Sequence, residues 1–139
     1  MIRPLTVEDI PVLLKSREDF SDGWNKDMLI SAFNSGRFIG YIAEEKGEVL
    51  AYLTASLTID EGDIESVFTF PKHRKKGLAF SLISKFISDY RNLKKIFLEV
   101  RKSNIPAINA YKKADFKQIS ERKKYYPDGE DALIFVKEN

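Results

Sequence analysis

The sequence predicts a single α/β domain built around a mixed β-sheet. Segments whose apolar residues alternate with polar ones, as in strands, are interleaved with segments that have the 3.6-residue spacing of amphipathic helices. No repeat, low-complexity stretch or linker divides the 139 residues. With 43% hydrophobic and 32% charged residues, the composition is that of a globular protein. One domain, residues 1–139, is therefore expected.

Two helices are predicted near the start of the chain. Thr6 and Asp9 have the spacing of a variant capping box, which predicts a helix from residue 7 to about residue 19. A second helix is predicted over residues 25–34, and Gly36 is placed to end it.

A hairpin and a third strand are predicted next. Strands over residues 38–44 and 49–57 are joined by a tight turn at Lys46 and Gly47. A third strand runs from about residue 64 to residue 70.

A helix then begins at Leu78, because apolar residues recur at positions 82, 83, 86, 87 and 90. Residues 95–101 form the next strand. A strand, helix and strand in succession favour a parallel pair of strands.

The last part of the chain predicts a short helix and a hairpin. The helix covers residues 105–114, with Pro106 in its first turn. The hairpin consists of residues 117–125, a turn at residues 127–129 and a strand over residues 132–137.

The segment just before the helix that begins at Leu78 is rich in basic residues. Arg74, Lys75 and Lys76 precede Gly77 and Ala79. Unpaired N–H groups and the helix dipole favour an anion at a helix N-terminus, and small residues let a diphosphate approach the backbone. The loop therefore indicates a phosphorylated ligand, and a solvated basic turn is the alternative interpretation.

Composition excludes several kinds of chemistry. The absence of cysteine excludes disulfides, thiolate metal sites and a covalent Cys-acyl intermediate, and a single histidine, His73, excludes a His-rich metal site. No metal is therefore expected. A net charge of +2 is too small to indicate nucleic acid. The chain has neither a long apolar run nor the apolar core of a signal peptide at its N-terminus, so a cytoplasmic protein without a membrane partner is expected.

Glu99 is the first candidate for chemistry. It lies within Ile-Phe-Leu-Glu-Val, a run that predicts a strand covered on both faces. A carboxylate there could be a general base, because partial burial would raise its pKa toward that of a proton acceptor. It could equally form a structural ion pair with Arg101, which alternation places on the same side of the strand.

Asn104 and Tyr111 are the next candidates. They are seven residues apart on the predicted short helix, so they lie nearly on one face. A phenol has a pKa of roughly 10 and can protonate a departing thiolate. The alternatives are a core aromatic for Tyr111 and a helix cap for Asn104.

Two motifs resemble the GCN5-related N-acetyltransferase (GNAT) family. The spacing Arg74-x-x-Gly77-x-Ala79, after a strand that ends at Pro71, resembles its acyl-CoA signature. Residues 98–111, Leu-Glu-Val-Arg-x-Ser-Asn-x-x-Ala-Ile-x-x-Tyr, followed by Phe116, resemble the second half of the bacterial ribosomal-protein-alanine N-acetyltransferases in that family. The resemblance implies a mostly antiparallel central sheet with one parallel strand pair, helices on both faces, and acetyl-CoA as cosubstrate.

The resemblance also implies a role for each matching residue. Glu99 matches the general base, Tyr111 the general acid, and Asn104 a residue that contacts acetyl-CoA. The strand backbone at Val67, Phe68 and Thr69 would hold the pantetheine arm. The basic loop and the start of the next helix would hold the diphosphate, through Arg74, Lys75, Lys76, Gly77, Leu78, Ala79 and Phe80.

Two shorter resemblances indicate which residues bind the acceptor. Tyr-Tyr-Pro at residues 125–127, followed by Gly-Glu-Asp-Ala, resembles the C-terminal hairpin of the subfamily, and Trp24 with Asn25 resembles its Trp-Ser. In the family these segments flank the acceptor groove, so Trp24 and Tyr126 are candidate substrate-binding residues. A core tryptophan and a strand-end tyrosine are the alternatives.

Three positions depart from the family pattern. Ala79 replaces the more frequent glycine, and Asp115 stands where glycine is usual and is expected to adopt the left-handed conformation at a modest cost in stability. His73 is expected to be solvated or to contact CoA rather than to act as a base.

These residues predict direct transfer of acetyl from acetyl-CoA to the α-amine of a protein N-terminus in a ternary complex. Glu99 would accept the amine proton through water, backbone N–H groups would polarise the thioester, and Tyr111 would protonate the thiolate. A small amine, such as a polyamine, an amino acid or an aminoglycoside, is the alternative acceptor, and a non-catalytic acyl-CoA-binding module is the alternative class. Either a monomer or a homodimer is compatible with the sequence.

Overall fold

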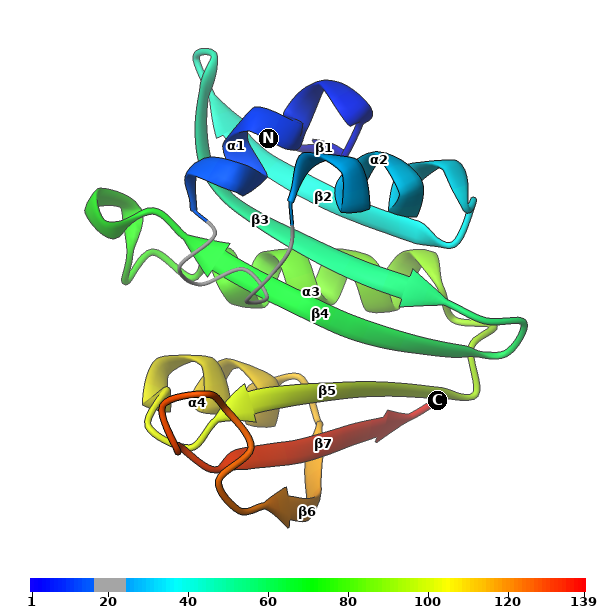
Figure 1. The fold of residues 1–139 in the computed structure, drawn as a ribbon, viewed down its shortest axis with the longest axis vertical. Coiled ribbons are helices and arrows are strands. Elements are labelled where there is room, and N and C mark those ends of the chain that lie inside the picture. Colours follow the sequence, from blue (N-terminus) through cyan, green and yellow to red (C-terminus); the bar gives the residue numbers. More distant parts are fainter. Residues whose placement is uncertain (17–24) are drawn as a thin grey trace.

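A computed structural model describes residues 1–16 and 25–139 and contains one seven-stranded sheet with helices on both faces (Figure 1). The spatial order of the strands is β1-β2-β3-β4-β5-β7-β6. The strands are β1 (Ile2–Pro4), β2 (Phe38–Glu45), β3 (Glu48–Leu57), β4 (Glu61–Thr69), β5 (Lys95–Arg101), β6 (Lys117–Arg122) and β7 (Ala132–Glu138). The α-helices are α1 (Ile10–Lys15), α2 (Lys26–Asn34), α3 (Leu78–Asp89) and α4 (Ile105–Lys113), and the 3-10 turns are η1 (Val7–Asp9) and η2 (Pro71–His73).

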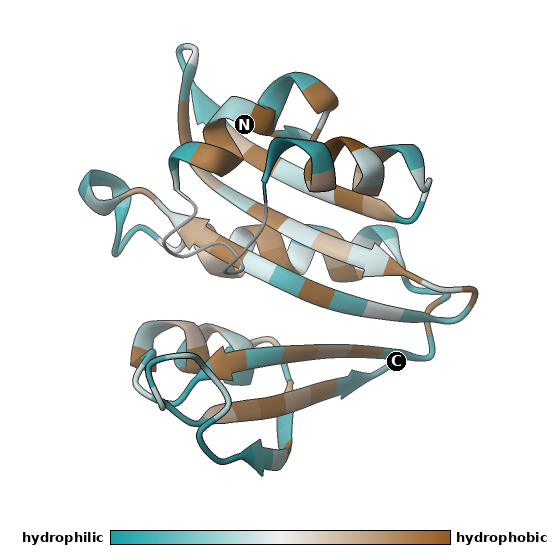
Figure 2. Ribbon diagram, in the orientation of Figure 1, coloured by the Kyte–Doolittle hydropathy of each residue, from teal (hydrophilic) through white to brown (hydrophobic). Residues whose placement is uncertain are grey.

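Two separate apolar cores cover the two faces of the sheet. The first contains buried residues of α3 and α4, such as Phe86 and Tyr111, together with Leu98 and Phe135 of the sheet. The second contains buried residues of α1 and α2, together with Tyr52 of β3. Apolar segments line the helices toward the sheet, whereas the loops before α3 and between β6 and β7 are largely hydrophilic (Figure 2). The predicted α/β class, with helices on both faces, is confirmed.

One strand pair is parallel and the others are antiparallel, as predicted. β4 pairs with β5 in parallel, and α3 connects them across the first core. The final strand, β7, lies between β5 and β6 and is antiparallel to both. A β-bulge interrupts the β3–β4 register next to Thr54 and Ala55, where Thr54 lies opposite Ser66 and Ala55 opposite Ile64.

The local signals used for the first helices are present in the structure. The Asp9 carboxylate accepts a hydrogen bond from the Thr6 N–H at 2.8 Å, as the capping box predicted. The Asn25 side chain caps α2 through the N–H of Met28 at 2.9 Å, and Gly36 has a φ of 73° just after the helix. The predicted helix starts as the turn η1, and α1 ends at Lys15 rather than near residue 19.

The earlier end of α1 has a local cause. The hydroxyl of Ser16 donates to the carbonyl oxygens of Val12 and Leu13 at 3.2 Å and lies 2.6 Å from the hydroxyl of Tyr52. These bonds hold the C-terminal turn against β3. Residues 17–19 of the predicted helix lie outside the described residues.

Three other boundaries differ from the sequence prediction. β1 was not predicted, because three residues with one proline carry too little periodicity. β4 begins at Glu61 rather than near residue 64. The prediction missed its first residues because charged side chains occupy the exposed positions there. β6 ends at Arg122 rather than at residue 125. Within the ranges 1–16 and 25–139, none of the helices has the length and apolar character needed to span a bilayer.

Candidate active site

The parallel strands separate after a short paired stretch. β4 and β5 pair from Glu61 opposite Lys95 to Ile64 opposite Leu98. The described strands carry no further pairs, although β4 continues to Thr69 and β5 to Arg101. Figure 1 shows the two strands diverging toward their carboxyl ends. Backbone polar groups on the facing edges are therefore available to an extended ligand, and Val67, Phe68 and Thr69 lie on this edge.

The basic loop lies at the N-terminus of α3, as predicted. Lys75 and Gly77 have positive φ angles of 67° and 77°, so the backbone turns sharply before the 12-residue helix. Lys75, Lys76 and Gly77 are exposed, and the first N–H groups of α3 point out of the helix end. This geometry suits an anion such as a diphosphate.

The side chains of this segment divide into two groups. Leu78 and Phe80 are partly buried against the first core, whereas Lys75 and Lys76 project from the loop. Arg74 turns back toward β4: its Nε donates to the carbonyl oxygen of Thr69 at 2.8 Å. Arg74 therefore braces the loop against the strand that is predicted to hold the pantetheine arm.

Of the two expected environments of His73, solvated or in contact with CoA, the first is wrong, because the side chain is largely covered. Its side chain is only 11% exposed, and Nε2 lies 2.9 Å from a carboxylate oxygen of Glu48. The contact ties the loop to the β2–β3 turn, where Glu48 also pairs with Lys72. His73 thus has a structural environment, in which its imidazole is paired with Glu48.

Glu99 lies on a half-covered face of β5. Ile96, Leu98 and Val100 are buried in the first core, and the alternate residues Phe97, Glu99 and Arg101 are partly exposed on the other face. The expectation that both faces of the strand are covered is therefore wrong, because α1 and α2 pack over the β2–β4 part of the sheet and leave β5 open. The Glu99 side chain is 34% exposed, and its carboxylate lies 3.7 Å from Arg122.

Tyr111 lies on the opposite face of the sheet from Glu99. Its ring is buried among the residues of the first core, at 5.8 Å from the ring of Phe116. Burial, and to a smaller degree the nearby Tyr126, raise the pKa of Tyr111 well above its usual range. The phenol therefore remains protonated throughout the physiological pH range and has a proton to give.

Asn104 is a helix cap in the structure. Its side-chain oxygen accepts a hydrogen bond from the N–H of Ala107 at 3.3 Å, at the start of α4. Asn104 and Tyr111 therefore lie on the same helix, as the seven-residue spacing indicated. The contact of Asn104 with acetyl-CoA stays a prediction.

The loop between β6 and β7, residues 123–131, carries the predicted acceptor-side tyrosine. The guanidinium of Arg101 stacks on the ring of Tyr126, at 4.0 Å from its centroid. The rings of Tyr125 and Tyr126 meet edge to face at 5.2 Å. The Glu99 carboxylate lies within reach of the Tyr125 hydroxyl and is the main cause that raises the pKa of Tyr125. Both tyrosines thus border Glu99, although only Tyr126 was singled out in the sequence.

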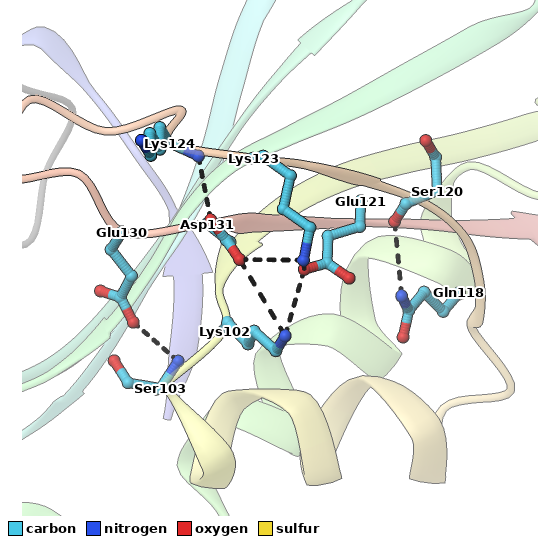
Figure 3. Close-up of polar contacts among 9 residues, drawn as sticks. All are labelled: Lys102, Ser103, Gln118, Ser120, Glu121, Lys123, Lys124, Glu130 and Asp131. Carbon is cyan, nitrogen blue, oxygen red and sulfur yellow. Dashed lines mark hydrogen bonds and ion pairs between the residues drawn. The ribbon is translucent and has the colours of Figure 1, made fainter.

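A network of ion pairs fixes this loop to the segment that joins β5 and α4. Glu130 accepts a hydrogen bond from the N–H of Ser103 at 2.8 Å, and Arg101 reaches Glu130 and Asp128 at 3.2 and 2.9 Å. Figure 3 shows the adjoining contacts, in which Lys102 of the β5–α4 turn and Lys123 of the loop both pair with Glu121 of β6 and Asp131 of the loop. The acceptor side is therefore attached to the end of β5.

Two carboxylates that sequence reasoning missed lie near Glu99. Asp63 is level with Phe97 in the parallel pair, and it lies on the same face as Glu99. Burial, followed by repulsion from Glu99, raises the pKa of Asp63 to about 6. Burial, followed by repulsion from Asp63, raises the pKa of Glu65 to about 7. The signal was present in the sequence as Asp-x-Glu alternation, which was hidden because the strand was predicted to start at residue 64.

Trp24, the other candidate for substrate binding, lies outside the described residues. Asp115 has a φ of 69°, which confirms the left-handed conformation expected where glycine is usual.

A basic loop at the start of a helix, next to an opening between diverging parallel strands, suits an acyltransferase that uses a CoA thioester. Residues 10–116 match the acetyltransferase (GNAT) family, and the chain therefore belongs to this family. This finding confirms the enzyme class predicted from the sequence.

Relatives of this chain include proteins named as N-terminal acetyltransferases. It is 32% identical over 111 residues to an N-alpha-acetyltransferase of Sulfurisphaera tokodaii, over 69% of this chain and 66% of that protein. It is 31% identical over 111 residues to the [ribosomal protein bS18]-alanine N-acetyltransferase of Escherichia coli K12, over 76% of this chain and 75% of that protein. The crystal structure of the Escherichia coli ribosomal-protein-S18-alanine N-acetyltransferase superposes with a TM-score of 0.86 and 26% identity, covering 98% of this chain and 91% of that one.

Proposed function

We propose that this protein transfers acetyl from acetyl-CoA directly to the α-amine of a protein N-terminus. The observation that carries the proposal is the placement of Glu99 and Tyr111 on opposite faces of the sheet, with Glu99 on β5, where β5 and β4 diverge. A carboxylate on one side can take a proton from an incoming amine, and a phenol on the other can give one to a leaving thiolate. The names of the two relatives described above support an N-terminal acceptor.

The residues present fit acetyl-CoA. The N–H groups at the start of α3, with Lys75 and Lys76, would hold the diphosphate, and the unpaired edge of β4 at Val67 to Thr69 would pair with the pantetheine amides. Asn104 would contact the same arm from the start of α4. The thioester would then lie in the opening, where backbone N–H groups can polarise its carbonyl.

The proposed reaction needs no covalent enzyme intermediate. Glu99, through water, accepts a proton from the acceptor ammonium, and the free amine attacks the thioester carbon. As the carbon–sulfur bond breaks, Tyr111 protonates the sulfur. The raised pKa makes the Tyr111 phenol a weaker acid, which opposes this proton transfer. The same apolar surroundings also destabilise the departing thiolate, so the proton still moves from the phenol to sulfur.

The side that the acceptor reaches is lined by groups suited to a cation. Glu99, Asp63 and Glu65 supply negative charge, and Tyr125 and Tyr126 supply aromatic rims. Two acceptors fit this surface, a peptide N-terminus and a small polycationic amine. The loop tyrosines favour the peptide, because their rings offer a surface along which an extended chain can lie.

The test measures CoA release with acetyl-CoA and matched peptides whose N-termini are free or already acetylated, beside a panel of small amines. Turnover confined to free N-termini supports the proposal. Turnover on small amines alone would assign the protein to the second acceptor class. Tight acetyl-CoA binding without turnover on any amine would indicate a binding module.

A further inference from the structure

A second carboxylate, Asp63, shares the acceptor side of the sheet with Glu99. β4 and β5 are adjacent and parallel here, and Asp63 is level with Phe97, one alternation before Glu99. The offset along the strand is roughly 7 Å, and with the roughly 4.8 Å between neighbouring strands it corresponds to a backbone separation of roughly 8 Å. A primary ammonium with its three N–H donors can span two carboxylates at that spacing, directly or through one water.

The surroundings of Asp63 bring together several groups that respond to charge. Glu65 follows it on β4 and accepts a hydrogen bond from Ser56 of β3, the residue opposite Asp63. Tyr125 approaches from the loop between β6 and β7, and Arg122 of β6 pairs with Glu99. Arg122 is the one cation among these groups, so the described surface around Asp63 carries an excess of negative charge.

Two unpaired hydroxyls on the same face provide an independent observation. Thr54 and Ser66 lie opposite each other on β3 and β4, in the row next to Ser56 and Asp63. Their side chains are buried, with residue exposures of 0% and 7%, and neither hydroxyl has a hydrogen-bond partner among the described residues. Buried hydroxyls are normally satisfied, so among the described residues this pair is available to a polar ligand or an ordered water beside the carboxylates.

An organic cation suits this surface better than a metal ion. No three His, Asp or Glu side chains among residues 1–16 and 25–139 are grouped closely enough to hold a metal ion. The groups are instead spread along one strand and its neighbours, over the length of an extended amine-bearing chain.

We propose that Asp63 is a second acceptor-binding carboxylate, which receives the ammonium of the acceptor together with Glu99 and shares its proton. This inference rests on the proposed function and specifies how the acceptor is held. One ammonium proton passes to the carboxylate pair, and the nitrogen lone pair then forms the bond to the acetyl carbon. When the carbon–sulfur bond breaks, Tyr111 gives its proton to sulfur, and the second nitrogen proton replaces it through water.

Repulsion between the carboxylates of Asp63 and Glu99 favours the binding of a cation between them. Two neighbouring carboxylates repel one another, and an ammonium between them relieves that repulsion. Because the pKa of Asp63 is raised to about 6, the carboxylate is charged above that pH and neutral below it. Acceptor binding should therefore weaken as the pH falls through about 6.

The test compares Asp63→Asn with Glu61→Gln. Glu61 lies on the same strand and the same face, one alternation farther from Glu99, so its variant is a matched control. Initial rates are measured between pH 5 and 9 on the amine that the wild-type protein accepts best. We expect Asp63→Asn to raise the acceptor KM about tenfold with a smaller change in kcat, and to remove the decline of kcat/KM near pH 6. Asp63→Glu, which keeps the charge, should restore most of the loss.

The outcomes separate this inference from the proposed function. An unchanged KM and pH profile in Asp63→Asn, or equal effects in Glu61→Gln, would overturn the inference even if N-terminal peptides are acetylated. Wild-type turnover on small amines alone would overturn the N-terminal proposal, while the same variants would still measure the part played by Asp63. Absence of turnover on every amine would overturn both.

Discussion

Arg101→Ala tests how firmly the loop of residues 123–131 is held beside Glu99. The guanidinium of Arg101 contacts three groups of this loop: the carboxylates of Asp128 and Glu130, and the ring of Tyr126. The substitution removes all three contacts and leaves the bond from the Ser103 N–H to Glu130. The loop should therefore loosen without detaching.

The magnitude follows from the exposure of the contacts. The Arg101 side chain is 34% exposed, so each ion pair contributes about 0.2–1 kcal/mol. The stacking on Tyr126 adds about 0.5–1 kcal/mol. The free energy of unfolding should fall by about 1–3 kcal/mol, which lowers the Tm by roughly 3–10 °C in a domain of this size.

The assay combines thermal unfolding with acceptor kinetics, and Arg91→Ala, which changes an exposed arginine after α3, is the control. Arg101→Ala should lower the Tm and raise the acceptor KM, whereas the acetyl-CoA affinity should stay the same. The Tm difference should shrink in about 1 M salt, because the Debye length is then about 3 Å and the ion pairs are screened. If Arg101→Ala melted like Arg91→Ala and kept its acceptor KM, the contacts of Arg101 would not position the loop.

Three further substitutions separate chemistry, ligand binding and charge. Glu99→Gln should lower kcat by about 10²–10⁴-fold with no change in acetyl-CoA affinity, as measured by steady-state kinetics and calorimetry; an equal loss of both would assign Glu99 a structural role. Gly77→Ala should lower the free energy of unfolding by about 1–2 kcal/mol, because φ is 77°; no steric clash adds to this, since no atom lies within 4 Å of the added Cβ. Gly36→Ala, with φ of 73°, should lower the free energy of unfolding by the same amount in thermal unfolding. Only Gly77→Ala should also weaken acetyl-CoA binding. Glu65→Gln should leave the free energy of unfolding unchanged at pH 4 and increase it above pH 7. The reason is that the folded-state pKa of Glu65 is raised to about 7, so the wild-type carboxylate destabilises the fold once it is ionised. An equal gain at both pH values in denaturant unfolding would contradict this assignment.

Local signals in the sequence were sufficient for most elements. Asn25 and Gly36 delimit α2 because a cap and a left-handed glycine depend only on neighbouring backbone groups. β5 has the predicted bounds, Lys95–Arg101, because its buried residues alternate without interruption. The parallel pairing of β4 and β5 followed from the intervening helix, since such a connection returns the chain in the same direction.

The acceptor side could not be predicted as fully, because it depends on which strands become neighbours. Asp63 and Glu99 are 36 positions apart, and only the register of β4 and β5 places them on one surface. Arg101 was expected to be a possible partner of Glu99, but it forms ion pairs with Asp128 and Glu130, which the β5–β7 pairing brings close. The resemblance to a family supplied roles for single residues, whereas the contacts around them came from tertiary structure.

The pairing between β4 and β5 is the shortest between inner strands of the sheet, so this junction is held by fewer backbone contacts than its neighbours. Four residue pairs join these strands, whereas seven join β5 to β7 and eight join β2 to β3. The two halves of the sheet therefore depend on α3 and the first core to remain aligned. A ligand whose amides pair with the free strand edges would act as an additional strand at this junction. Occupancy should then slow amide hydrogen exchange on both sides of the junction, so that cosubstrate binding completes the sheet as well as supplying the reactive group.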